Sequence, residues 1–191
     1  SGCALCVACC PKNCITMQSD DLGYMRPVID DSLCIDCGLC AKKCIIENPE
    51  ALSHPILTAA AIRSDEEKLI LSSSGGVFAA IAEQLISKGW MVAGCIMDEQ
   101  LTPRHVLTSN IQVVKQMYGS KYVQSNTEGV YKDVAEVLQK GKKVLFSGTP
   151  CQVAAVKRFT KNNENLLTVE VICHGVPNVE MLHSYLDLHS R

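Results

Sequence analysis

The chain has 191 residues, of which 47% are hydrophobic and 5% aromatic, and its formal net charge is −2. This balance excludes a disordered chain and a basic nucleic-acid-binding surface, and the few aromatic side chains offer no base-stacking platform. No apolar stretch reaches the roughly 18 residues that a membrane-spanning helix needs. The length allows a small metal-bound module and one domain with its own core.

The first residues carry an incomplete cysteine run. Cys3-x-x-Cys6-x-x-x-Cys10-Pro11 matches the bacterial ferredoxin run C-x₂-C-x₂-C-x₃-C-P from its second cysteine onward. We expect the first cysteine of the run to precede Ser1 in a longer protein, of which this chain is a fragment. Cys9 and Cys14 lie outside the run, and either could step in for a missing ligand.

A hairpin and a complete cysteine run follow. Residues 15–17 and 24–29 predict two short strands, joined by a turn at residues 20–23 that ends in glycine. The second run has all four cysteines at ferredoxin spacing, with Ile45 in place of the usual proline: Cys34, Cys37, Cys40 and Cys44.

The two runs predict two 4Fe–4S clusters, because the fourth cysteine of each run of a two-cluster ferredoxin crosses to the other cluster. One cluster is then held by Cys10, Cys34, Cys37 and Cys40. The other is held by Cys3, Cys6, Cys44 and the missing cysteine, so we expect it to be labile or absent in this fragment. Electron transfer is the function that these clusters predict.

The cysteines have two other possible uses. Four thiolates also suit structural zinc, although three evenly spaced cysteines with a fourth four residues later are not a zinc-finger pattern. A secreted disulfide scaffold is disfavoured because no signal peptide is visible. Thiolate-bound clusters fit a reducing compartment, so the expected location is the cytoplasm.

Beyond the second run, two prolines indicate a linker at residues 47–57. The predicted fold is an α+β ferredoxin-like two-cluster module, residues 1–46, followed by an α/β domain with a mixed or parallel sheet, residues 58–191. The expected elements are a weak strand at 58–63, a helix at 75–88, a strand at 91–97, a helix from Thr127 as its cap to Gly141, a strand at 144–146, a helix at 149–159, a strand at 166–172 and a helix at 178–190.

Three loops and one basic turn of this domain could hold a ligand. Ser73, Ser74, Gly75 and Gly76 precede a helix, where free backbone N–H groups and the helix dipole favour a phosphate; plain N-capping by a serine is the alternative. In the basic turn after Gly119, Ser120 precedes Lys121, which could meet a phosphate or carboxylate but could equally be a solvated loop lysine.

The second ligand loop follows a buried strand, the place where open α/β sheets bind ligands. Its residues are Gly148, Thr149, Pro150, Cys151 and Gln152. The thiol near the helix start is expected to have a lowered pKa, and it could be redox-active, touch a flavin or simply be buried. In a third loop, His174 could contact a cofactor or move a proton, though a lone histidine is more often structural.

Four phrases in this order resemble a known family: residues 73–78 (SSGGVF), 119–124 (GSKYVQ), 148–152 (GTPCQ) and 173–177 (CHGVP). They are similar to the beta subunits of coenzyme F420 hydrogenases and dehydrogenases, in particular to bacterial members with an N-terminal two-cluster ferredoxin module. The resemblance covers essentially the whole chain, while family members typically continue past its last residue.

The resemblance implies an iron–sulfur flavoprotein oxidoreductase, with FAD in the α/β domain and coenzyme F420 as a possible small-molecule substrate. A redox partner protein, either ferredoxin or another oxidoreductase subunit, would exchange electrons with it. Part of the flavin or substrate site is expected to lie beyond this fragment. The alternatives are a non-catalytic electron-relay module that docks on a partner, and a zinc protein with another ligand in the α/β domain.

Overall fold

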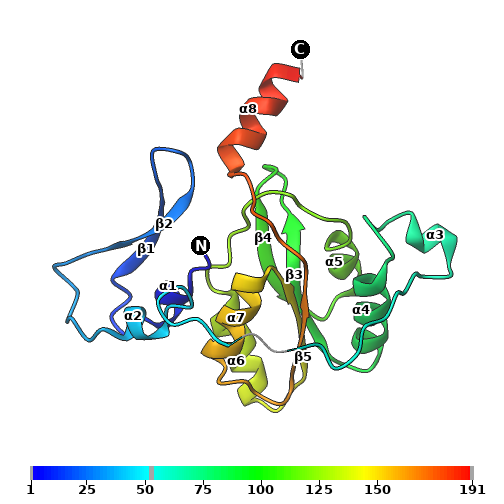
Figure 1. The fold of residues 1–191 in the computed structure, drawn as a ribbon, viewed down its shortest axis with the longest axis horizontal. Coiled ribbons are helices and arrows are strands. Elements are labelled where there is room, and N and C mark those ends of the chain that lie inside the picture. Colours follow the sequence, from blue (N-terminus) through cyan, green and yellow to red (C-terminus); the bar gives the residue numbers. More distant parts are fainter. Residues whose placement is uncertain (1, 52–53, 190–191) are drawn as a thin grey trace.

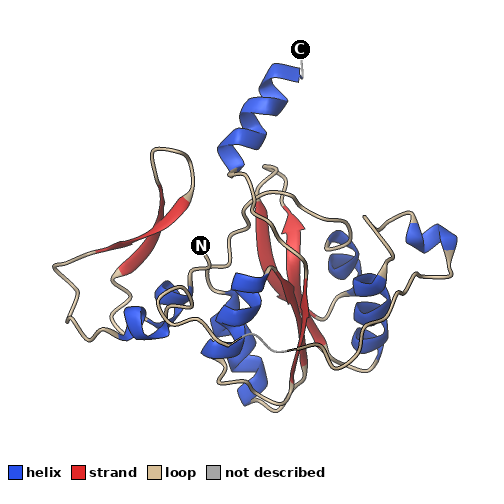
Figure 2. Cartoon of the chain, in the orientation of Figure 1, coloured by secondary structure: helices blue, strands red, loops and turns tan. Residues whose placement is uncertain are grey.

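The computed structural model describes residues 2–51 and 54–189 (Figure 1). The first 46 residues form a small antiparallel hairpin flanked by two short helices, and the rest builds a four-stranded sheet between helices (Figure 2). Residues 52–53 of the predicted linker and residue 190 of the predicted last helix lie outside the described residues. The division into two domains at this linker stays a prediction.

The hairpin pairs β1 (Ile15–Ser19) with β2 (Met25–Ile29), as predicted. Its turn is held by one carboxylate: Asp20 Oδ1 accepts hydrogen bonds from the backbone N–H groups of Leu22, at 3.0 Å, and Tyr24, at 2.8 Å. Gly23 takes the left-handed conformation, φ 80°, that the turn requires. The predicted turn is thus confirmed, and the Asp20 carboxylate supplies hydrogen-bond acceptors for the backbone N–H groups of the turn.

The two cysteine runs adopt the same backbone conformation at an offset of 34 residues, which relates Cys3 to Cys37 and Cys6 to Cys40. Each run curls into a one-turn helix, α1 (Leu5–Cys9) or α2 (Leu39–Lys43), that is followed at once by an extended cysteine. Left-handed residues recur at equivalent places: Gly2 and Asp36, then Ala4 and Gly38. A non-glycine residue there costs about 1–2 kcal/mol, so the surrounding structure must impose this conformation.

The larger sheet is mixed, with the strand order β4-β3-β5-β6. Three strands are parallel, β3 (Met91–Met97), β5 (Val144–Gly148) and β6 (Leu166–Glu170), and all three were predicted. The edge strand β4 (Pro103–Thr108) is antiparallel and was not predicted. Its segment begins with proline and carries Arg104 and His105, which obscure the hydrophobic pattern of a strand.

Helices cover both faces of this sheet (Figure 2). On one face, Val92 and Leu145 pack with α4 (Val77–Ser87) and α5 (Ile111–Gln116). On the other face, Ala93 and Phe146 pack with α6 (Val130–Gln139) and α7 (Pro150–Phe159). Neighbouring strand residues thus point to opposite faces, as the period of two requires. The short α3 (Glu66–Leu69) and the outlying α8 (Val179–His189) complete the described helices (Figure 1).

The predicted strand at residues 58–63 is wrong. This segment is largely exposed and pairs with no described strand. At its end, the Arg63 N–H donates instead to Gly75 O, in the loop before α4, at 2.8 Å. The Arg63 guanidinium also pairs with Glu83 of α4, which holds the pKa of that carboxyl below its usual range. Side-chain bonds rather than a sheet ladder hold the segment.

Replacing Gly38 by alanine tests the imposed left-handed conformation. Its φ is 65° and a Cβ there would meet nothing within 4 Å, so backbone strain is the only expected effect. We expect Gly38→Ala to lower the free energy of unfolding by about 1 kcal/mol, measured by urea denaturation. Lys42→Ala, an exposed change in α2, is the control and should have little effect.

Candidate functional site

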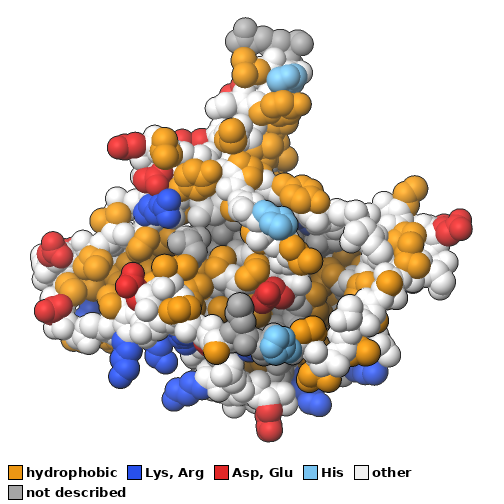
Figure 3. Space-filling view, in the orientation of Figure 1, with side chains coloured by type: hydrophobic (Ala, Val, Ile, Leu, Met, Phe, Trp, Pro, Cys, Tyr) orange, Lys and Arg blue, Asp and Glu red, His pale blue; other side chains and the backbone are white. Residues whose placement is uncertain are grey.

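Five cysteines line one cavity of about 160 Å³ in the N-terminal part. Four are the ligands that the sequence assigns to one cluster, and the fifth is the one that the spacing placed outside the runs: Cys10, Cys34, Cys37, Cys40 and Cys14. Cys34 and Cys37 are exposed, and exposed apolar side chains such as Leu33 and Ile35 lie beside them. Hydrophobic side chains are widespread on this part of the surface (Figure 3).

The cysteine-lined cavity is compatible with an iron–sulfur cluster. Within the described ranges, no group of three or more His, Cys, Asp or Glu side chains lies close enough to hold one metal ion. A cubane distributes its four thiolates over several iron atoms, so its ligands need not converge on one point. Left-handed residues beside the cysteines also give concave backbone N–H nests, which recur at iron–sulfur sites.

The first cysteine run is anchored to the α/β part through one carbonyl. Cys3 O accepts hydrogen bonds from the Thr127 hydroxyl, at 3.0 Å, and from the Tyr131 hydroxyl, at 2.9 Å. Leu5, only 1% exposed, joins the core cluster of α6 and α7. The predicted N-cap at Thr127 is therefore wrong: Gly129 is the N-cap of α6, because the buried threonine hydroxyl serves Cys3 instead.

The second cysteine run is held at its end by an arginine of α7. The guanidinium of Arg158 donates to the carbonyls of Lys43, at 3.3 Å, and Cys44, at 3.1 Å, and it pairs with Glu50 at 3.4 Å. Because α1 also packs on α7, both runs lie against the same side of the sheet domain. Cys44, the last cysteine of the second run, is thereby tied to the same α/β part that anchors the first run.

The loops that the sequence singled out gather at the carboxyl edge of the parallel strands. The helices α4 and α6 run into β3 and β5, and α7 follows β5, so all three helices begin at this edge. Ser73 Oγ accepts a hydrogen bond from Ser120 N at 2.6 Å, which joins the first two phrases. Gly76, φ 71°, caps α4 without a side chain, so the alternative of serine capping is wrong and both Ser73 and Ser74 are exposed.

Gln152 organises the third phrase. Its side chain accepts from Thr149 N at 2.9 Å, completing the capping box at the start of α7, and donates to Ser125 Oγ at 2.8 Å. Ser125 continues to His105 Nδ1 at 3.1 Å, and His105 Nε2 lies 3.1 Å from Ser147 O. Burial lowers the pKa of His105 to about 4, so the imidazole is neutral.

His105 is a residue that sequence reasoning missed, because it lies in the unpredicted strand β4 and belongs to no motif. Its ring stacks on Phe146 with 5.5 Å between centroids. The network thus holds Gly148 and the start of α7 in place, and each of its polar side chains has a hydrogen-bond partner. Such a framework positions a binding loop without itself being exposed to a ligand.

The remaining predicted residues have different surroundings. Burial raises the pKa of the Cys151 thiol, whereas the hydrogen bond with Thr149 Oγ1, 3.2 Å from its sulfur, lowers it; the pKa is raised overall, against the expected lowering, because desolvation outweighs this hydrogen bond. The nearby thiols of Cys3 and Cys173 raise this pKa further. Burial also disfavours the charged form of Lys121, which for an ammonium lowers the pKa.

The Lys121 ammonium donates to three backbone carbonyls of its own turn, those of Gln116, Tyr118 and Gly119. Pro150 begins α7, directly after Thr149. His174 is exposed in the loop that follows β6.

Gln124 joins the second and fourth phrases to the hairpin. Its backbone N–H donates to Pro177 O at 2.9 Å, and its side-chain oxygen accepts from Met25 N at 3.1 Å. Just beyond, the Asn178 side chain donates to Leu22 O in the hairpin turn. The second phrase therefore contacts the hairpin directly, and the fourth phrase contacts the second.

Known proteins resemble parts of this chain. Residues 141–190 match the family model of the coenzyme F420 hydrogenase/dehydrogenase beta subunit, C terminus. Over these residues the chain is similar to the C-terminal part of such beta subunits. Coenzyme F420 hydrogenase and dehydrogenase beta subunits are subunits of oxidoreductases, and the matched segment contains two of the four phrases, at 148–152 and 173–177.

Two individual relatives extend the comparison. An uncharacterized protein of Methanocaldococcus jannaschii is 27% identical over 201 residues, covering 87% of this chain and 54% of that protein. A chain of the xenon-derivatised F420-reducing NiFe hydrogenase complex from Methanosarcina barkeri shares the fold, with a TM-score of 0.54 and 20% identity, over 67% of this chain and 47% of that chain. The chain thus spans about half the length of both. The hydrogenase is a complex of several components.

None of the helices within residues 2–51 and 54–189 is both long and apolar enough to cross a membrane.

The buried His105 should make folding pH-dependent. The unfolded chain protonates this imidazole below about pH 6.5, whereas the folded chain resists protonation down to about pH 4. Stability from this group is therefore complete above pH 6.5 and falls as the pH drops toward 4, by up to about 3 kcal/mol. In urea denaturation of the metal-free chain at pH 7 and pH 5, followed by Trp90 fluorescence, His105→Gln should flatten this loss. An unchanged pH slope in the variant would contradict the assignment.

The anchor at Cys3 predicts a non-additive pair of variants. Thr127→Val and Tyr131→Phe should each cost about 1 kcal/mol of unfolding free energy, because the other hydroxyl still pairs Cys3 O. Together they leave a buried carbonyl unpaired and should cost about 1–3 kcal/mol more than the sum. Thr160→Val, which removes a bond within α7 alone, is the control and should be additive with either.

Proposed function

We propose that the chain is the electron-transferring part of an iron–sulfur flavoprotein oxidoreductase. Two 4Fe–4S clusters would sit in the cysteine module, of which the inner one has only three of its predicted ligands, Cys3, Cys6 and Cys44, in this chain, and FAD would bind at the carboxyl edge of the sheet. The observation that carries the proposal is the fastening of Cys3, a predicted cluster ligand, to the first turn of α6 at the edge where the family phrases gather. A cluster and a ligand site would then be direct neighbours.

The module gives the two predicted clusters different surroundings. The ligands Cys34 and Cys37 are exposed, so the cluster held with Cys10 and Cys40 would face a protein partner. Cys3 and Cys6 are half-buried, and their run packs on α6 and α7. Electrons would enter or leave at the exposed cluster and reach the ligand edge through the inner one. The partner is proposed to be ferredoxin or another oxidoreductase subunit.

The flavin half of the proposal rests on the helix starts. The first N–H groups of α4 and α7 have no partner within their helices, and the positive end of each helix dipole favours an anion. Ser73 and Ser120, joined by their hydrogen bond, border the first start, and Gly148 and Gln152 fix the second. FAD supplies its phosphates to such donors and exchanges both one and two electrons. Coenzyme F420 is the proposed small-molecule partner of the bound flavin.

A second candidate function is an electron relay without a flavin. The Lys121 ammonium favours this second function. It is already hydrogen-bonded to three backbone carbonyls, so it is less available to bind an anionic cofactor. The relay needs only the clusters and a docking surface. The two proposals therefore differ in whether the ligand edge retains FAD.

Anaerobic purification after cluster reconstitution tests both halves. We expect the chain to bind iron and acid-labile sulfide in equal amounts and to retain FAD, released by heat and identified by chromatography. Iron and sulfide without any retained flavin would support the relay instead, and zinc without sulfide would overturn both.

A matched pair of cysteine variants locates the exposed cluster. Cys37→Ser should lose one cluster, about four iron atoms, because that thiol lines the cavity. Cys95→Ser, in strand β3 away from the runs, should lose none. The outcome against the proposal is equal iron content in both variants, measured on preparations with matching circular dichroism.

A further inference from the structure

A fifth thiol stands beside the four predicted ligands of the exposed cluster. Cys14 lines the same cavity as Cys10, and the two sulfur atoms are 3.4 Å apart. The four-cysteine pattern gives Cys14 no role, and a free buried cysteine often acts only as a small apolar side chain. Here, however, the sulfur of Cys14 makes a polar contact with the sulfur of Cys10, a predicted cluster ligand.

A short turn produces this proximity. Pro11 follows Cys10, and Asn13 N donates to Cys10 O at 3.3 Å, which closes a four-residue turn with proline at its second position. Asn13 adopts φ 50°, a conformation that asparagine tolerates, and directs the chain back toward the cavity. The backbone of Cys14 is then fixed by Asp30, whose N–H donates to Cys14 O at 2.8 Å.

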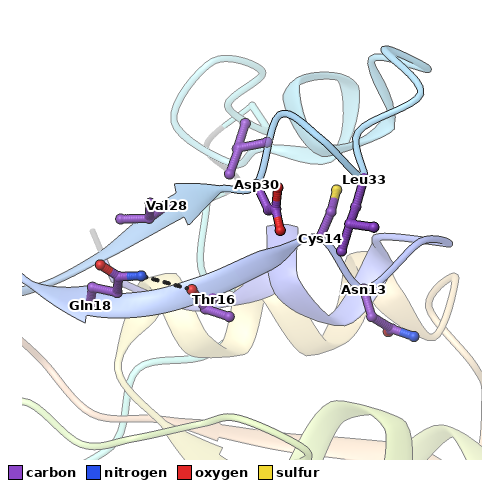
Figure 4. A pocket seen from close by; sticks show the side chains of 8 residues that line it. Asn13, Cys14, Thr16, Gln18, Val28, Asp30 and Leu33 are labelled. Carbon is purple, nitrogen blue, oxygen red and sulfur yellow. Dashed lines mark hydrogen bonds between the residues drawn. The ribbon is translucent and has the colours of Figure 1, made fainter.

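The side chain of Cys14 is held between two hollows of the module. On one side is the cysteine cavity, and on the other is a cavity of about 320 Å³ over the hairpin face. Figure 4 shows Cys14 at the start of β1, close to Asp30 and Leu33. The thiol is thus buried against the hairpin and needs only a small movement to replace its neighbour.

The internal repeat supplies a comparison within the same chain. The 34-residue offset relates Cys10 to Cys44 and Cys14 to Asn48. Asn48 has no thiol, and its side chain donates to Ala41 O at 3.0 Å, a bond that closes the end of α2. The second run therefore uses this position structurally, whereas the first run places a second thiol beside its crossing ligand.

Cys9 is the other cysteine outside the runs, and the structure gives it a different direction. Its sulfur contacts Cys6 O at 3.5 Å within α1. Cys9 is not among the residues that line the cavity. Adjacency in sequence to Cys10 therefore does not make Cys9 the substitute.

We propose that Cys14 is a reserve ligand of the exposed cluster, able to bind the iron that Cys10 holds when Cys10 is lost. The Cys14 thiol gives up its proton and binds the iron as a thiolate; where Cys10 is the departing ligand, its thiolate takes up that proton, so one iron–sulfur bond replaces another and no oxidant or reductant is needed. This inference rests on the proposed function, because it requires the cavity to hold a cluster.

The test compares four variants of the full chain after the same anaerobic reconstitution: Cys10→Ala, Cys14→Ala, Cys10→Ala with Cys14→Ala, and Cys10→Ala with Cys9→Ala. Iron and sulfide are counted, and electron paramagnetic resonance spectra are recorded after reduction. Cys10→Ser is added as a second substitution of Cys10, because it leaves the size of the side chain nearly unchanged. Trp90 fluorescence and circular dichroism verify that each variant is folded.

We expect Cys14→Ala to match the unsubstituted chain in metal content and spectrum. Cys10→Ala should keep its iron and sulfide but show shifted g values, since one ligand sulfur has moved. The Cys10/Cys14 double variant should lose one cluster, about four iron atoms, while the Cys10/Cys9 double variant should keep it.

Loss of that cluster in Cys10→Ala and Cys10→Ser alone would overturn the reserve-ligand role while leaving the proposed function intact. Loss only in the Cys10/Cys9 double variant would assign the role to Cys9 and equally overturn it. An unsubstituted chain that binds no iron and sulfide would instead overturn the proposed function, and the inference with it.

Discussion

The carbonyl of Cys3 is the point on which the arrangement depends. Two hydroxyl groups, from Thr127 and Tyr131, donate to it in a place from which water is largely excluded, so the run cannot leave without unpairing three polar groups. Leu5 adds apolar burial beside the same contact. These interactions orient the first cysteine run, and through α1 and α2 they orient the second.

This anchoring connects local chemistry to electron transfer. Cluster ligands must keep their geometry through changes of charge, and short one-turn helices with left-handed residues cannot do so by helix propensity alone. The α/β part supplies the stiffness, since its core contains Tyr131, whose hydroxyl donates to the run. An inner run on a rigid edge and an outer run at the surface suit a path from a partner protein to a ligand.

The sequence predicts what depends on local spacing. Cysteine intervals indicate the clusters, and the turn from Asp20 to Gly23 indicates the hairpin. Contacts between distant residues are beyond such reasoning. Thr127 has the sequence of a helix cap but serves a carbonyl 124 residues away. His105, hidden in an unpredicted edge strand, is identified only when Ser125 and Gln152 are seen beside it.

Hydrogen exchange, read residue by residue, tests the central claim that the first cysteine run and the α/β domain open as one unit. The account predicts that the protected amide hydrogens of α1 exchange with the same free energy of opening as those of α6 and α7. It also predicts that the combined Thr127→Val and Tyr131→Phe substitution uncouples them. Fast exchange of α1 together with the hairpin, while α6 and α7 stay protected in the unsubstituted chain, would contradict the account.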